Sequence, residues 1–589
     1  MKNATPAATR TRLRHLLPLF TGQKQAFVLG FLLLAATNAS AAAIPYMMKL
    51  ATEALMHQEG LTRHILTLLA LAVANAFFRI QSRTRIFGMG RDVEFALRQR
   101  YHAQLLTLDA PFFDQEKTGD LAARAAADVS AVRMFVGPGF LQISNVLMAY
   151  VATLPVMVGL DPLLTLYALA PIPLVLGLSR LLTRRMYRLS RVVADRFGHL
   201  SGFIQESIAG IAAIHAHARE ADWNARFTAE TNELSQAAIR HARMQSLFGP
   251  MVLLAGASGG FIILAYGGQE VASGRLTMGD FVAFSGYLAM LIWPTVGFGW
   301  ILTVMQRGLA ALDRISMVLD AQPFLPPAIA AAPAAPQRWN GAIAIRNLSF
   351  AFRPDRPVLQ EITLDIPPGA LIGLAGRIGS GKSALLQLLA RLYPAPPDTL
   401  FIDGREISTL PEAELRRELT MVPQESFLFS APLLRNLQLD RPGADQEAVQ
   451  EAIRLAAFDD EVRHFPKGLE TLIGERGITL SGGQRQRAAL ARALVGAPTI
   501  LLLDDVFSHV DARTEERILH NLRAAHRLRT VVMVCHRIAA LKQADRIYLL
   551  DQGRIVASGT HETLLADSPL YRDLNTTMSR AEALEALAQ

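Results

Sequence analysis

The pattern of apolar and polar positions divides the chain into two unlike halves. Up to about residue 305, mainly apolar stretches recur, and each runs for roughly 18 to 25 residues, enough for a helix to cross a hydrocarbon layer of about 30 Å. The pattern predicts six spans, at residues 26–48, 64–82, 138–159, 162–182, 248–268 and 279–305. We therefore expect the first half to be a six-helix α-helical transmembrane domain.

The connections between these spans alternate in length and charge. Residues 83–137 and 183–247 interleave charged and apolar positions at a period near 3.6, which predicts helices extending beyond the membrane. Arginines gather in these long connections and near the N-terminus, whereas the short connections hold few cations. The positive-inside rule then predicts that the N-terminus and the long connections face the cytoplasm.

Residues 322–341 are rich in proline and alanine and indicate a linker between the two halves. We expect a transmembrane domain at 1–321, this linker, a second domain at 342–578 and a C-terminal tail at 579–589. Short apolar runs followed by helical patterns predict an α/β fold for the second domain.

Composition narrows the class of protein. Hydrophobic residues make up 51% of the chain, charged residues 19%, and the mean hydropathy is +0.25, which argues against a wholly soluble or disordered protein. The one cysteine, Cys535, excludes internal disulfides and sites that need two thiolates. The net charge of +8 suits basic cytoplasmic loops, and with six spans no nucleic-acid partner is expected.

The second half contains a phosphate-binding loop. The apolar run 371–375 leads into Gly-x-x-x-x-Gly-Lys-Ser at 376–383, and a helical pattern follows. Glycines let the backbone N–H groups point at phosphates, the lysine reaches the β- and γ-phosphates, and the serine hydroxyl binds Mg²⁺. The cofactors expected are therefore ATP and Mg²⁺, held here by Gly376, Gly379, Ser380, Gly381, Lys382 and Ser383.

Two carboxylates end another predicted strand. The run 499–503 is apolar and leads into Asp504 and Asp505. A carboxylate at the end of a parallel strand beside a phosphate loop lies where Mg²⁺ needs an oxygen ligand. We assign that role to Asp504, and we expect Asp505 to polarise the attacking water.

Residues 480–484, Leu-Ser-Gly-Gly-Gln, resemble the signature of ATP-binding cassette proteins, and Arg-Gln-Arg follows as in that family. Six spans fused to one cassette resemble an exporter half-transporter, an ATP hydrolase coupled to transport. The resemblance implies a dimer of two half-transporter chains in which each ATP lies between one chain's phosphate loop and the other's signature. The signature residues that would contact that ATP are Ser481, Gly482, Gly483 and Gln484.

The same resemblance assigns further residues. Phe352 resembles the aromatic residue that stacks on adenine, and Gln424 the glutamine that senses Mg²⁺ and the membrane domain. His536 resembles the switch histidine near the γ-phosphate. Glu475 and Asp511 resemble residues that contact the partner chain.

The residue after the Mg²⁺ aspartate departs from the family pattern. Most active members have glutamate there, whereas this chain has Asp505, whose carboxylate is one methylene closer to the backbone. The expectation is a degenerate site that binds ATP and hydrolyses it slowly, while the intact signature completes a partner's site. This asymmetry resembles the first subunit of Mdl-type heterodimeric pairs. His509, where alanine is common, also departs from the pattern.

The resemblance implies ATP-driven efflux of small hydrophobic or amphipathic compounds, drugs or lipids, from a bacterial inner membrane. The scarcity of charges within the spans favours apolar cargo. The other partners expected are membrane lipids, and the N-terminus and ATPase domain are expected in the cytoplasm. A homodimeric exporter or lipid flippase, an importer built on the exporter fold, and an ATP-gated regulator or channel remain as alternatives.

Overall fold

The computed structural model describes residues 24–323, 338–353, 355–474, 480–525 and 530–588, with residues 14, 15, 18 and 477 besides. The chain forms two compact units: Met1–Thr107 with Lys117–Ala321, and Leu108–Glu116 with Gln322–Gln589. Most of the predicted linker, residues 324–337, and Glu475 lie outside the described residues.

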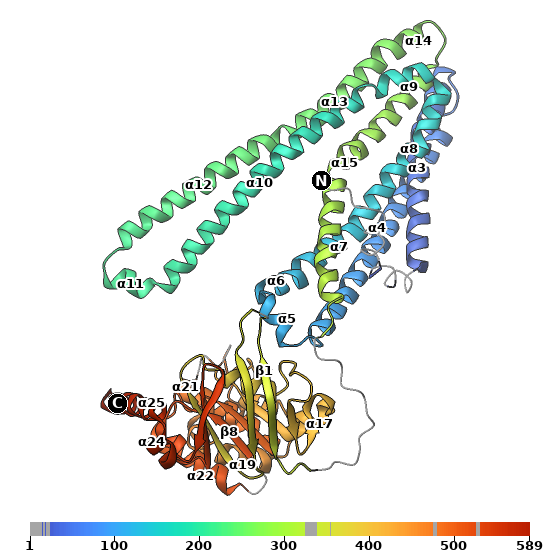
Figure 1. The fold of residues 1–589 in the computed structure, drawn as a ribbon. Helices are drawn as coiled ribbons and strands as arrows, with labels where there is room; N and C mark the ends of the chain where they lie inside the picture. Colours follow the sequence, from blue (N-terminus) through green and yellow to red (C-terminus); the bar gives the residue numbers. More distant parts are fainter. Residues whose placement is uncertain are drawn as a thin grey trace. The chain divides into compact units, whose positions relative to one another are not determined.

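The first unit is helical. Helices α10 and α12 run side by side over their length and are joined at one end by the short α11 (Figure 1). Three π-helical turns interrupt the helices: η1 (Arg124–Asp128), η2 (Phe135–Gly139) and η3 (Ile263–Gly267). The helices are α3 (Lys24–Met56), α4 (Thr62–Leu105), α6 (Thr118–Ala123), α7 (Val129–Met134), α8 (Phe140–Leu160), α9 (Pro162–Leu169), α10 (Pro171–Ala209), α11 (Ile211–Ala216), α12 (Glu220–Ser246), α13 (Phe248–Ile262), α14 (Gly268–Ala272) and α15 (Met278–Leu319).

Four continuous helical stretches among the described residues are long and apolar enough to cross a membrane: Lys24–Met56, Thr62–Leu105, Thr118–Leu160 and Glu220–Ala272. They contain the first, second, third and fifth predicted spans. The fourth predicted span falls across α9 and α10, which meet at Ala170, and the sixth falls within α15. The transmembrane helical domain is thus confirmed, and the count of six spans stays a prediction.

Local capping fixes where two of these helices begin. The Asp161 carboxylate accepts hydrogen bonds from the N–H groups of Leu163 and Leu164, both at 2.8 Å, and so starts α9. Thr277 and Asp280 form a reciprocal capping box at the start of α15. Both caps replace main-chain partners that the first turn of a helix lacks.

The helices of the first unit approach closely where side chains are small. A Cβ added to Gly90 of α4 would lie 3.1 Å from the Cα of Gly137 in η2, so the two backbones are nearly in contact. Arg314 of α15 donates to both carboxylate oxygens of Asp128 in η1, at 2.7 and 2.6 Å. Small residues and a bidentate ion pair thus join α15 and α4 to the segment between α6 and α8.

The second unit contains two sheets and the short helix α5 (Ala110–Gln115). One sheet is antiparallel, in the order β2-β1-β4-β5, and the other has the order β10-β9-β3-β8-β7-β6. In the second sheet β9, β3, β8, β7 and β6 are parallel and β10 is antiparallel to β9. The strands are β1 (Ile343–Phe350), β2 (Leu359–Ile366), β3 (Leu371–Gly376), β4 (Leu400–Ile402), β5 (Arg405–Glu406), β6 (Leu419–Val422), β7 (Ile500–Asp504), β8 (Thr530–Val534), β9 (Arg546–Asp551) and β10 (Arg554–Gly559).

Helices cover the parallel sheet, as its sequence requires. Strands β7 and β8 are buried at every position, because a parallel sheet is covered on both faces. The helices are α16 (Lys382–Leu389), α17 (Glu412–Glu418), α18 (Leu433–Leu437), α19 (Gln446–Leu455), α20 (Asp459–His464), α21 (Gly482–Val495), α22 (Ala512–Ala524), α23 (Ile538–Lys542), α24 (His561–Asp567) and α25 (Pro569–Ala588), with 3-10 turns η4 (Ile407–Thr409) and η5 (Gly468–Glu470).

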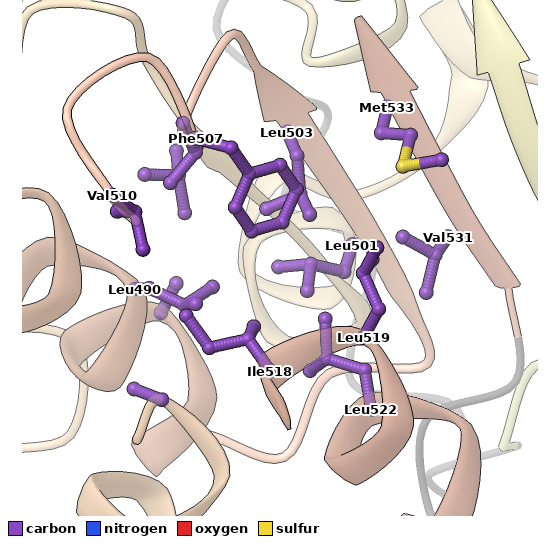
Figure 2. Close-up of a cluster of buried hydrophobic side chains, with 14 of the residues drawn as sticks. Leu490, Leu501, Leu503, Phe507, Val510, Ile518, Leu519, Leu522, Val531 and Met533 are labelled. Atoms are coloured by element: carbon purple, nitrogen blue, oxygen red, sulfur yellow. The ribbon is translucent and has the colours of Figure 1, made fainter. Parts of the chain in front are cut away.

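Alternate side chains of β7 pack into two different hydrophobic cores. Leu501 and Leu503 point into a cluster with Ile518 and Leu522 of α22 (Figure 2), whereas Leu502 belongs to the core on the opposite face. The strand that carries Asp504 therefore packs against a hydrophobic core on each face, and this packing holds its carboxyl end in place.

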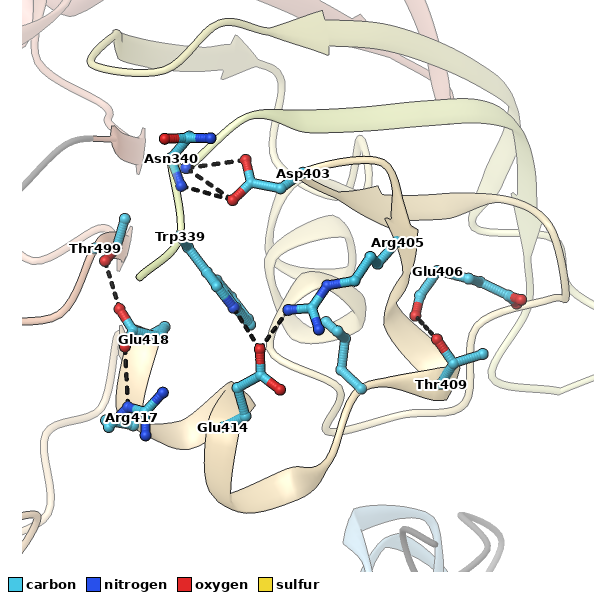
Figure 3. Close-up of polar contacts among 12 residues, drawn as sticks. Trp339, Asn340, Asp403, Arg405, Glu406, Thr409, Glu414, Arg417, Glu418 and Thr499 are labelled. Atoms are coloured by element: carbon cyan, nitrogen blue, oxygen red, sulfur yellow. Dashed lines mark hydrogen bonds and ion pairs between the residues drawn. The ribbon is translucent and has the colours of Figure 1, made fainter. Parts of the chain in front are cut away.

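Asp403 closes the start of the antiparallel sheet. Its carboxylate accepts hydrogen bonds from the backbone N–H groups of Asn340, Gly341 and Ala342, between 2.6 and 3.3 Å (Figure 3). Asp403 itself has a positive φ of 48°, a conformation that Asp and Asn adopt more readily than most residues. One carboxylate thus holds the segment that enters β1.

We expect Asp403→Ala to lower the free energy of unfolding of the ATPase unit by about 2 kcal/mol, because charge-assisted hydrogen bonds to backbone N–H groups are lost. Asp403→Asn is the matched control, since it keeps one acceptor oxygen and the backbone preference. Thermal unfolding of both variants measures the effect. Equal unfolding temperatures for Asp403→Ala and the wild type would contradict this assignment.

Candidate functional site

The predicted site residues meet at one edge of the parallel sheet. Strands β3, β8, β7 and β6 are consecutive neighbours, and parallel strands end at the same edge. The phosphate loop follows β3, while the candidate residues of the other three strands lie within two positions of each strand end. A cavity of about 440 Å³ is lined there by the phosphate loop and by Phe352, Gln424, Asp504, Asp505 and His536.

The loop keeps its shape because glycine occupies positions where a side chain does not fit. Gly376 has φ +151°, and a Cβ there would lie 2.1 Å from the carbonyl oxygen of Leu550. Gly381 has φ +99°, and a Cβ there would lie 2.6 Å from Cδ2 of Leu359. The two glycines thus let the loop fold closely over β9 and β2 and leave its hollow for a ligand.

Lys382 begins α16 and lies over the loop. Its ammonium group donates to the carbonyl oxygens of Gly376 and Arg377, both at 2.9 Å, and it is 3.4 Å from the hydroxyl of Ser380. Burial lowers the pKa of Lys382, and the nearby carboxylates of Asp504 and Asp505 oppose this effect. The arrangement sets a cation at a helix N-terminus, which suits a polyphosphate.

Ser383 and Asp504 form the pair expected of a Mg²⁺ site. The serine hydroxyl donates to Oδ1 of Asp504 at 2.9 Å. Burial raises the pKa of Asp504, and the adjacent Asp505 raises it further. The described residues contain no group of three His, Cys, Asp or Glu side chains that could hold a metal ion by itself, so a cation here needs ligands from the nucleotide or water as well. That donor set of hard oxygens fits Mg²⁺.

Asp505 lies beside Gln424 and His536. Its backbone has φ +48°, and its Oδ2 is 3.4 Å from Nε2 of Gln424. Burial raises the pKa of Asp505, and the smaller electrostatic effect of His536 and Lys382 opposes this rise. Burial also lowers the pKa of His536, which favours the neutral imidazole. A buried carboxyl of raised pKa next to a neutral imidazole is equipped to accept a proton.

Phe352 forms an aromatic cluster at the mouth of the cavity. Its ring lies 4.9 Å from Tyr393 and 5.0 Å from Phe350, in edge-to-face geometry, and 46% of Phe352 is exposed. The Tyr393 hydroxyl donates to the Asp114 carboxylate of α5 at 2.6 Å. Sequence reasoning missed Tyr393 and Asp114, because nothing in their spacing indicates that residues so far apart are in contact.

The signature residues lie apart from this cavity, at the start of α21. Ser481 and Gln484 form a capping box there. The glycines between them pack on His509: a Cβ at Gly482 would lie 3.1 Å from the imidazole, and one at Gly483 would lie 2.6 Å from the His509 carbonyl oxygen. His509 therefore supports the signature, a contact that its sequence position alone does not predict.

Cys535 precedes His536 and is directed away from solvent. Only 1% of the residue is exposed, and its sulfur accepts a hydrogen bond from the N–H of Arg537 at 3.3 Å. Burial strongly raises the pKa of the thiol. The cysteine acts here as a small packing residue behind the histidine.

Family comparisons agree with this architecture. The ABC transporter transmembrane region matches residues 27–295, and the ABC transporter ATPase family, described as "ABC transporter", matches residues 359–508. The first match lies in the helical half of the chain and the second in the half that contains the two sheets.

Curated relatives match over most of their own length. The chain is 34% identical over 525 residues to "Probable multidrug resistance ABC transporter ATP-binding/permease protein YheI" of Bacillus subtilis, covering 87% of this chain and 88% of that protein. It is 33% identical over 524 residues to "Multidrug resistance-like ATP-binding protein MdlA" of Escherichia coli, covering 89% and 88%.

A solved structure shares the fold. "Structure of a bacterial Atm1-family ABC exporter with ATP bound" superposes with a TM-score of 0.76 and covers 94% of this chain and 97% of that one. The sequence identity is 24%, so this likeness concerns the fold alone.

Proposed function

The chain belongs to the ABC transporter family, as an integral membrane exporter of the multidrug type with its transmembrane and ATPase domains in one polypeptide, and from this premise we propose that it exports hydrophobic or amphipathic compounds as one half of a heterodimer. The observation that carries the proposal is the cavity in which Asp505, and no glutamate, lies beside Gln424 and His536. The cargo we propose is a drug or a lipid.

We propose that ATP lies along the cavity from Phe352 to the phosphate loop. The Phe352 ring stacks on adenine, and Lys382 with the loop N–H groups holds the phosphates. Ser383, Asp504 and Gln424 would hold Mg²⁺, which would neutralise phosphate charge when bound. His536, which follows β8, would face the γ-phosphate and donate a hydrogen bond from its ring N–H to a phosphate oxygen.

Asp505 is the proposed general base, and its length makes the site degenerate. A base must bring its oxygen within about 2.6 to 3.2 Å of the attacking water, and proton transfer contributes about 10²- to 10⁴-fold to the rate. The Asp505 backbone is fixed by its N–H bond to Val534, 3.1 Å long, and by its positive φ. An aspartate on this fixed backbone reaches less far into the cavity than a glutamate.

The signature of this chain is proposed to serve the partner's ATP. Half-transporters of this family dimerise, and in the described chain residues 481–484 take no part in lining the nucleotide cavity. The partner we propose is a different half-transporter that carries the catalytic glutamate.

The orientation that we propose for the chain in the membrane follows from the positive charge of the long connections between the spans. The N-terminus and the ATPase domain lie in the cytoplasm, and the membrane is a bacterial inner membrane. The domains are 1–321, the linker 322–341, the ATPase domain 342–578 and the tail 579–589. Membrane lipid surrounds the first domain, and nucleic acid is no partner.

The expected behaviour of the chain alone tests the heterodimer. In lipid nanodiscs we expect slow ATP turnover, or failure to dimerise, when turnover and particle mass are measured on the same sample. Vigorous turnover by a stable dimer would favour a homodimeric exporter or flippase. ATP-driven uptake of a hydrophobic dye by inverted vesicles supports export, whereas uptake only by right-side-out vesicles would indicate an importer.

Phe352→Ala is expected to weaken ATP binding about tenfold, because stacking on a base contributes about 1 to 3 kcal/mol. Phe352→Trp is the matched control and should retain affinity, since it keeps an aromatic face. Titration with a fluorescent ATP analogue at equilibrium measures both. Unchanged ATP affinity of the Phe352→Ala variant would show that the Phe352 ring packs against Tyr393 and does not stack on adenine.

A further inference from the structure

A second cavity lies within the helical unit and has two unlike walls. Its volume is about 210 Å³, and it is formed by α3, α4, α8 and α15. Leucine, alanine, methionine and proline side chains make up one part of the wall. The polar part consists of Thr37, Asn38, Arg79, Ser82, Arg83 and Asn145. A cavity with this lining is amphipathic.

A buried amide orients the first arginine. Asn75 is 7% exposed, and its Nδ2 donates to the Thr37 carbonyl oxygen at 2.7 Å and to the Ser40 hydroxyl at 3.0 Å. Its Oδ1 is thereby directed at Arg79, whose Nη2 donates to it at 2.9 Å. The guanidinium is held in place by a neutral acceptor, so its charge is positioned without being neutralised.

The second arginine adds charge on the same face. Arg83 is four positions after Arg79, one helical turn away, and both side chains are exposed. Across the cavity, Asn38 donates to Oδ1 of Asn145 at 3.2 Å, which ties α3 to α8 beside the two arginines. Two cations and a neutral polar rim thus face one space.

The helices around the cavity carry few acidic side chains. Helix α3 carries one acid, Glu53, near its far end; α8 carries none; the first acid of α4 is Asp92; and those of α15 are Asp280 and Asp313. Among the described residues neither arginine takes part in an ion pair. By contrast Arg133 pairs with Glu94 at 3.1 Å and Arg314 with Asp128 at 2.6 Å.

The position of these charges makes them costly unless they have a ligand. Arg79 falls within the second predicted span, and an ionisable residue at such a place marks a substrate or ion pathway by default. Arg83 follows at its end. Guanidinium groups bind carboxylates and phosphates through paired hydrogen bonds, which gives them both strength and geometry.

We propose that this cavity binds the anionic headgroup, carboxylate or phosphate, of an amphipathic compound, with Arg79 and Arg83 on the headgroup and the apolar wall on the adjoining chain. The proposal rests on the export function proposed above, because it names the class of cargo. The cavity is smaller than the roughly 300 Å³ at which drug-sized sites begin, so it fits a headgroup and the start of a chain. Within the expected class of hydrophobic or amphipathic compounds, it favours amphipathic anions.

Binding in the absence of ATP tests the site. The full chain is placed in phosphatidylcholine nanodiscs and titrated with dansylated undecanoic acid, whose fluorescence rises in an apolar site. Dodecanoate and dodecyl phosphate are expected to displace the probe at concentrations about tenfold or more below those of dodecylamine or dodecanol. Equal displacement by all four would overturn the proposal.

Variants assign the effect to the arginines. Arg79→Gln with Arg83→Gln is expected to weaken dodecanoate binding about tenfold or more, and Arg79→Lys should retain part of it. The matched control is Arg85→Gln on the same helix, because Arg85 donates to Gln81 and does not line the cavity. Equal weakening by Arg85→Gln, or unchanged binding by the double variant, would overturn the assignment. Unchanged helical circular dichroism and thermal unfolding in the nanodisc show that the helical unit of each variant is folded.

Two further measurements distinguish a lipid ligand from a free amphipathic acid, and the headgroup site from the export function. If the ligand is a lipid, phosphatidylglycerol in the nanodisc lowers probe affinity in the wild type and not in the double variant; if it is a free amphipathic acid, probe affinity is the same in both membranes. Headgroup binding that persists although a complex containing this chain and a partner half-transporter shows no ATP-driven transport would refute the export function and leave the site standing.

Discussion

Asp505→Glu is expected to raise ATP turnover about a hundredfold wherever the chain forms a dimer in lipid nanodiscs, because general bases contribute about 10²- to 10⁴-fold when their oxygen reaches the water. The added methylene extends the carboxylate from a backbone that its N–H bond to Val534 holds in place. Steady-state phosphate release at saturating ATP and Mg²⁺ measures the change.

The neighbouring carboxylate provides a matched control. Asp504→Glu adds the same methylene one position earlier, but Asp504 is 4% exposed and accepts from Ser383 at 2.9 Å, so the longer side chain has no room. We expect that variant to lose turnover. A wild type as fast as Asp505→Glu would show that aspartate is an adequate base and would remove the argument for a glutamate-bearing partner.

The second large effect is expected at the first glycine of the phosphate loop. Gly376→Ala should destabilise the ATPase unit by about 2 to 5 kcal/mol and abolish ATP binding, because the new Cβ is both strained and overpacked. It would lie 2.1 Å from the Leu550 carbonyl oxygen, within the pairing of β3 with β9. Thermal unfolding and fluorescent-nucleotide titration measure the two consequences.

Gly379→Ala separates strain from overpacking. Gly379 also has a positive φ, of 80°, but a Cβ there would meet no atom within 4 Å. We expect a loss of about 1 kcal/mol and weakened rather than abolished ATP binding. If both alanine variants lost the same stability, backbone strain alone would account for the requirement for glycine.

The strands around the nucleotide cavity were predictable because burial on both faces leaves a continuous apolar run. The runs at 371–375 and 499–503 correspond to β3 and β7, and 530–534 is β8. The rule that parallel strands end at one edge then places Asp504 beside the phosphate loop. Chemistry borne by strand ends is therefore readable from the sequence when the strands are central.

The remaining features depend on packing between distant segments, which periodicity does not encode. The contact of Tyr393 with Asp114 joins residues from different halves of the sequence. The cavity at Arg79 depends on how α3, α4 and α8 pack and on the orientation of one amide. A count of charges within the spans favours apolar cargo, whereas the proposal of an anionic headgroup depends on the arrangement of Asn75 with Arg79.

The burial of Cys535 has a practical consequence for following motion in this transporter. Thiol reagents attack the thiolate form of cysteine. Cys535 is only 1% exposed and the pKa of its thiol is strongly raised, so almost no thiolate is accessible to such reagents. The wild-type chain therefore already serves as a background for site-directed labelling. A single cysteine introduced at an exposed position would carry a spin label or dye alone, so distances between paired chains become measurable without first removing a native residue.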